Sequence, residues 1–75
     1  MARKLTEEEI AEQAAGVNEV VQSGRVRERT HRYLDENWGP LVLLAVADLN
    51  GITFDVDKPR KSTIIKAILD ERFGE

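Results

Sequence analysis

Basic side chains gather in two stretches of this 75-residue chain, and their types and spacing suit the binding of an anion. One stretch lies within residues 25–32 and the other within residues 58–66. Guanidinium and ammonium groups on one helix face form charge-assisted hydrogen bonds with phosphate oxygens. The candidate phosphate-binding residues are Arg25, Arg29 and Arg32 in the first stretch, and Lys58, Arg60, Lys61 and Lys66 in the second.

Each basic group also has an explanation that needs no ligand. Glutamates crowd the first twenty residues, and the arginines of residues 25–32 could pair with them. Arg60, Lys61 and Lys66 could form an ordinary solvated helix face. The sequence leaves these alternatives open for both groups.

Residue types for catalysis or metal binding are scarce. The chain has no cysteine and one histidine, His31, which has no evident partner for acid–base chemistry. Asp55 and Asp57 are two carboxylates without further ligands, and a divalent cation needs more oxygen ligands than they offer. We therefore predict no enzyme activity, no catalytic residue, no metal site and no cofactor.

The length of the chain limits the number of domains, and its net charge limits how it could bind nucleic acid. Seventy-five residues form one domain, 1–75, and so short a chain buries only about 60% of its unfolded surface. Because self-association is one way to stabilise so small a core, we expect a homo-oligomer. The net charge of −3 argues against binding nucleic acid over the whole surface. Any such binding must be local.

Hydrophobic patterning predicts a soluble protein. The sequence opens with basic and acidic residues rather than a secretory signal. Its longest apolar run, residues 41–47, is far shorter than the roughly 20 residues that span a bilayer. We expect a cytoplasmic, intracellular protein that makes no contact with membranes.

The first half of the chain has helical periodicity. We expect a disordered tail at residues 1–5 and a helical region at 6–36, which Thr6 and Glu9 open as a capping box. Gly24 divides that region. Either one long helix runs through a dent at Gly24, or two helices meet there at a kink or tight turn, and we favour two helices.

The second half predicts two more helices around an extended segment. Pro40 suits the first residue of a helix, and Asn50 and Gly51 suit its end. Residues 41–49 are so apolar that the helix should be covered on most sides. Residues 52–56 alternate apolar and polar side chains, as an extended segment does. Lys58 and Pro59 should open the last helix, which Gly74 ends. We thus predict a small all-α fold of four helices, with a short extended segment at 52–56 between the last two.

Trp38 lies beside Gly39 and Pro40, in the break before the apolar helix. Its ring could stack on a base or anchor a partner. It could instead cover the apolar helix as part of the core, and we favour this second role.

Residues 41–73 resemble the helix–extended-loop–helix group of domains, which includes the SAP, LEM and HeH domains. The resemblance rests on Gly51-Ile52 at the end of a helix, Arg60-Lys61 at the start of the next, and the apolar spacing of Ile64, Ile65 and Ile68. The loop length is closer to that of LEM and HeH domains than to SAP. The resemblance implies a compact helical pair, residues 40–73, whose basic second helix contacts DNA phosphates or whose loop docks a protein.

Two functional hypotheses follow. The first is a small DNA-binding accessory or regulatory protein that contacts the phosphate backbone of double-stranded DNA with little readout of base sequence. The second is a protein–protein interaction module, such as an adaptor, inhibitor or assembly subunit, that binds no nucleic acid.

Overall fold

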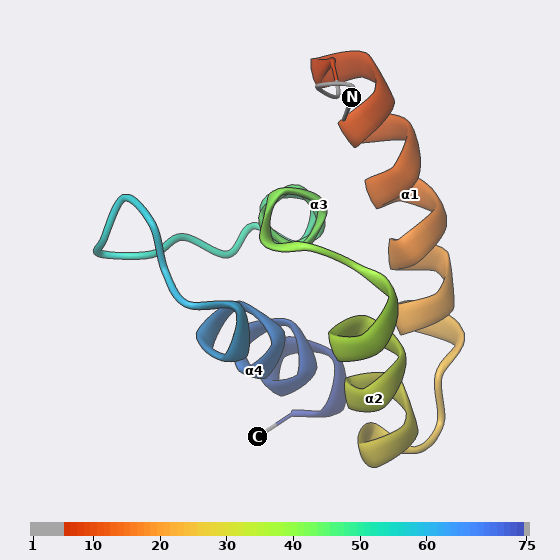
Figure 1. Ribbon diagram of the computed structural model, residues 1–75. Helices are drawn as coiled ribbons and strands as arrows, with labels where there is room; N and C mark the ends of the chain where they lie inside the picture. Colours follow the sequence, from red (N-terminus) through yellow and green to blue (C-terminus); the bar gives the residue numbers. More distant parts are fainter. Residues whose placement is uncertain (1–5, 75) are drawn as a thin grey trace.

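A computed structural model describes residues 6–74 and contains four helices (Figure 1). They are α1 (Glu7–Ser23), α2 (Arg27–Asn37), α3 (Pro40–Leu49) and α4 (Lys61–Phe73). No strand occurs in this part of the chain. The predicted all-α class with four helices is therefore confirmed, whereas the disordered tail predicted at residues 1–5 lies outside the described residues.

Two separate helices form the first half of the chain, as favoured. Thr6 caps α1: its hydroxyl accepts from the Glu9 amide at 3.2 Å, and the Glu9 carboxylate accepts from the Thr6 amide at 3.3 Å. At the other end Gly24 has extended backbone angles and ends the helix. Arg25 lies before the first residue of α2. The predicted crowding of arginines against the positive end of a helix dipole is thereby reduced.

Close contact with Thr30 explains the glycine at the α1–α2 turn. The Thr30 side chain is 6% exposed and donates a hydrogen bond to the Val26 carbonyl oxygen at 3.1 Å. A Cβ atom at Gly24 would lie 2.5 Å from the Thr30 hydroxyl oxygen, well inside van der Waals contact. Only glycine therefore lets the turn approach α2 this closely.

The hydrophobic core lies where the four helices meet. Helix α4 contacts each of the other three, and α3 packs between α1 and α4 (Figure 1). None of the described helices is both long and apolar enough to span a membrane. The almost fully buried apolar residues are Ala14, Val17, Val21, Leu34, Val42, Leu43, Val46, Ala47, Ile64, Ile65, Ile68 and Leu69.

The core covers most sides of α3, as predicted, and residues 42–47 are buried or partly buried, but one strip is not covered. Leu41 is 62% exposed and Leu49 is 56% exposed. Helices α1 and α4 pack against other parts of α3, and the chain after α3 leads away from it as a loop (Figure 1). Leu41 and Leu49 therefore form an apolar strip of α3 that faces outward.

The loop after α3 begins with a tight helix end. Gly51 has a positive φ of 71°, and its amide and that of Ile52 donate to the Asp48 and Ala47 carbonyl oxygens, each at 3.0 Å. These two bonds form a Schellman motif, for which glycine is suited.

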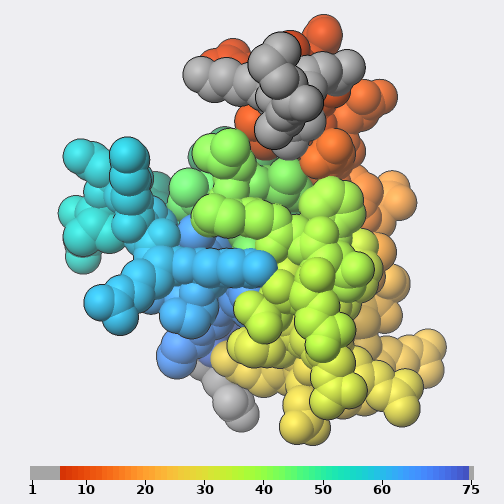
Figure 2. Space-filling view, viewed as in Figure 1, coloured from red at the N-terminus to blue at the C-terminus, as the bar shows by residue number. Residues whose placement is uncertain are grey.

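Residues 52–60 form neither helix nor strand and project from one side of the molecule (Figures 1 and 2). Ile52 and Phe54 are partly buried, as the alternation predicts, but Val56 is 61% exposed. Helix α4 begins at Lys61, later than the predicted start at Lys58 and Pro59. Pro59 is buried instead, and the Arg60 backbone is still extended.

Gly24→Ala should destabilise the fold by about 1–3 kcal/mol, because the new methyl group displaces the buried Thr30 side chain. Gly16→Ala is the matched control. Nothing lies within 4 Å of its added Cβ, and alanine inside a helix should stabilise by about 0.5–1 kcal/mol. Urea unfolding measures both changes. Equal stability of the two variants would contradict the close contact at Gly24.

Candidate functional site

Helices α2 and α4 run antiparallel, with a polar contact at each end. At the start of α4, Lys61 Nζ donates to the Asp35 carbonyl oxygen at 2.6 Å and lies 3.9 Å from its carboxylate. At the other end, Arg27 Nη2 donates to Asp70 Oδ1 at 2.5 Å. Lys61 thus places its positive charge at the C-terminal end of α2, where a cation interacts favourably with the negative end of the helix dipole.

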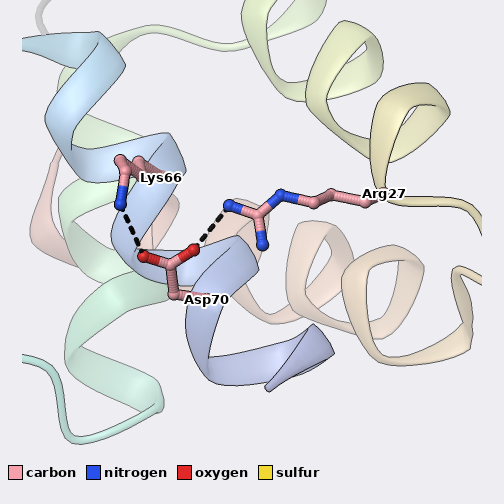
Figure 3. A network of polar contacts seen from close by, with 3 residues as sticks. All are labelled: Arg27, Lys66 and Asp70. Carbon is pink, nitrogen blue, oxygen red and sulfur yellow. Dashed lines mark hydrogen bonds and ion pairs between the residues drawn. The ribbon is translucent and has the colours of Figure 1, made fainter. Parts of the chain in front are cut away.

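Asp70 joins two cations in one network (Figure 3). Its second oxygen, Oδ2, accepts a hydrogen bond from Lys66 Nζ at 3.0 Å. The hydrogen bond from Arg27, followed by that from Lys66, holds the pKa of Asp70 below its ordinary value of 3.8. Although 73% of the Lys66 side chain is exposed, its ammonium group is paired with the Asp70 carboxylate.

Arg72 has a structural role that no pattern in the sequence indicates. Its Nε donates to the carbonyl oxygens of Val21 at 3.2 Å and Gln22 at 3.1 Å, and its Nη2 donates to that of Gly24 at 2.9 Å. The last turn of α1 contains no basic residue of its own. Arg72 therefore supplies the donors and the positive charge that a helix C-terminus favours.

The arginines predicted around α2 are exposed, but they share their surface with acidic residues. Arg25, Arg29 and Arg32 form no ion pair within the part of the chain that the structure describes. The alternative in which these three arginines pair with the glutamates of α1 is therefore not observed among the described residues. Exposed acidic residues of α2 lie among these arginines, namely Glu28, Asp35 and Glu36. This mixed surface is less suited to phosphates than the sequence suggested.

An open groove of about 570 Å³ lies between the loop and the start of α4. Lys58 and Arg60 line it, and both are exposed. In Figure 2 the loop and the beginning of α4 lie side by side on one face of the molecule. The remaining lining residues are Thr53, Phe54, Asp55, Val56, Pro59 and Thr63.

The first turn of α4 lacks the features that usually neutralise a helix N-terminus. Among the described residues, no side chain caps it through Arg60, and the turn contains no acidic residue. The first helical hydrogen bond is made by the Ile64 amide, so the amides of residues 61–63 precede it. Helix α1, by contrast, has both a capping box and three glutamates in its first turn. The start of α4 thus combines open amide donors with neighbouring cations.

The structure separates the seven predicted residues into distinct surroundings. Lys58 and Arg60 come together in the groove, whereas Lys61 turns to α2 and Lys66 pairs with Asp70. Phe54 and Thr63, which also line the groove, were missed because the sequence does not show where the loop lies relative to the first turn of α4.

The structure also bears on Trp38 and on possible metal ligands. Trp38 packs partly against the core, as favoured, although its buried indole Nε1 has no hydrogen-bond partner among the described residues. Within the same residues, no cluster of three or more potential metal ligands occurs.

Comparison with protein families, with curated proteins and with solved structures found no match for the chain.

The Asp70 network predicts a pH dependence of stability. Because the pKa of Asp70 is lowered in the folded state, its stabilising effect is present above its ordinary pKa and is lost as the pH falls through the lowered value. Asp70→Asn should therefore be less stable than the parent protein at pH 7, and the difference should shrink below about pH 4. Thermal unfolding from pH 7 to pH 2 measures this difference. A gap that stays constant with pH would contradict the network.

Proposed function

We propose that the chain is a small non-catalytic DNA-binding protein that contacts backbone phosphates through Lys58, Arg60 and the open amides at the start of α4. The observation that carries the proposal is the first turn of α4, which is basic and uncapped beside an open groove. The resemblance of residues 41–73 to SAP, LEM and HeH domains supports the same surface.

The charge arrangement favours an anion from outside the protein. A cation near a helix N-terminus opposes the dipole and costs about 0.3–1 kcal/mol, whereas an anion there is stabilised by a similar amount. Phosphate oxygens accept hydrogen bonds from helix N-terminal amides and from cationic side chains together. A bound phosphate would thus turn an unfavourable arrangement of Lys58 and Arg60 into a favourable one.

The scale of the site fits an accessory role. Two cations and one helix terminus neutralise only two or three phosphates, so binding should be modest and should weaken with salt along a shallow slope. The net charge of −3 opposes any wider contact with DNA. Lys61 and Lys66 are secondary in this proposal, because each already has an acidic or carbonyl partner within the protein.

Charge reversal tests the proposal. The double substitution Lys58→Glu with Arg60→Glu should abolish or strongly weaken binding to a labelled DNA duplex, measured by fluorescence anisotropy at several salt concentrations. For the parent protein, the slope of log K against log salt should be about −2 to −3. Both side chains are exposed, so the melting temperature should hardly change.

The matched control is Arg29→Glu with Arg32→Glu, which makes the same change of charge on α2. This control should retain most of the binding. An equal loss in the two double variants would indicate a response to net charge alone, and unchanged binding in the first would reject the proposed site.

The outward strip of α3 favours a second candidate function, a protein-interaction module. Leu41 and Leu49 of this strip are each more than half exposed, as is Val56 in the loop, and exposed apolar side chains of this kind often mark protein-binding surfaces. The homo-oligomer expected from the chain length would form on the same strip. A protein partner that docks on this strip should bind the Lys58→Glu, Arg60→Glu variant with the same affinity as the parent protein. This result would separate the interaction module from phosphate binding.

A further inference from the structure

We infer that the groove beside α4 binds single-stranded DNA, with a base stacked on Phe54 and the adjoining phosphate on Lys58 and Arg60. This inference rests on the proposed function and adds the form of nucleic acid that the site selects. It depends on the apolar part of the groove, which phosphate binding alone does not use.

The groove combines two kinds of surface within one concave site. Phe54, Val56 and Pro59 supply apolar lining beside the two cations. Val56 is 61% exposed, and Phe54 is only partly covered by the core. A site for phosphates alone has no need of exposed apolar side chains next to its cations.

A single strand matches both surfaces, whereas a duplex matches one. In a duplex the base faces are stacked on one another, so a protein groove of this size meets mainly phosphates and sugars. In a single strand the base faces are accessible and stack on aromatic side chains, while cations follow the backbone. The aromatic ring of Phe54 and the charges of Lys58 and Arg60 thus fit neighbouring parts of one nucleotide.

Acidic residues of the loop restrict the course of the strand. Asp55 lines the groove, and Asp57 is exposed in the same loop. Their carboxylates repel phosphates, so the backbone should run along the α4 side of the groove, past Arg60 and Thr63. A base, which carries no charge and offers N–H donors, is tolerated beside Asp55.

Three labelled ligands of equal length test the inference by fluorescence anisotropy at low salt. They are a 20-nucleotide oligothymidylate, its duplex with oligoadenylate, and a 20-unit abasic deoxyribose-phosphate strand. Charge density alone would favour the duplex, because a duplex releases more counterions per contact than a single strand. We expect the oligothymidylate to bind about tenfold more tightly than the abasic strand, the gain typical of one stacked base, and more tightly than the duplex.

The possible failures are distinguishable. If the abasic strand or the duplex binds as tightly as the oligothymidylate, the stacking inference is wrong and phosphate binding stands. If none of the three ligands binds at low salt, the proposed function itself fails. These comparisons use the unmodified protein, so they do not depend on whether any variant folds.

Two matched substitutions then locate the stacked base. Phe54→Leu keeps an apolar side chain but removes the ring, and should weaken oligothymidylate binding about tenfold without changing abasic-strand binding. Phe73→Leu is the control, because the only other phenylalanine also packs partly against the core but does not line the groove. Equal effects of the two substitutions on oligothymidylate binding would overturn the role of Phe54.

Discussion

Four side chains on one side of α4, Ile64, Ile65, Ile68 and Leu69, are at most 1% exposed, and their burial joins the four helices. Burial of one such side chain contributes about 1.5–3 kcal/mol relative to exposure. Because α4 packs against each of the other three helices, this burial fixes where its first turn lies. The loop before it must then cross from the end of α3 to that turn (Figure 1), and residues of this loop and of the start of α4 line the groove.

Charged residues around α4 divide into structural and open groups. Arg72 binds the C-terminal carbonyls of α1, Lys61 binds that of Asp35 in α2, and Asp70 joins Arg27 to Lys66. These contacts hold the ends of α4 against the first two helices. The cations that remain open near its first turn are in the groove. This division explains how a chain with a net charge of −3 can present a local basic site.

Local signals predicted most of the fold. The capping box at Thr6, the break at Gly24, Pro40 as the first residue of a helix, and the stops at Gly51 and Gly74 all agree with the structure. They succeed because each depends on backbone chemistry within a few residues. The start of α4 was placed too early because Pro59 is also acceptable at a helix start, and its burial is a tertiary effect.

The candidate site was predictable only in part. The sequence marks Lys58 and Arg60 as cations, but it does not show that Lys61 turns to the Asp35 carbonyl or that Lys66 pairs with Asp70. The exposure of Leu41 and Leu49 was also missed, since apolar composition indicates burial without showing which elements supply the cover. Side-chain partners distant in sequence decide all of these outcomes, and no local pattern encodes them.

The most direct test of phosphate binding at α4 is to map amide chemical-shift changes in a ¹⁵N-labelled sample while a short DNA oligonucleotide is added. The account predicts that the largest shifts fall on the amides of residues 61–63 and on Lys58 and Arg60, and that they diminish as salt is raised. Shifts confined to α2, or to the outward strip of α3 at Leu41 and Leu49, would contradict it.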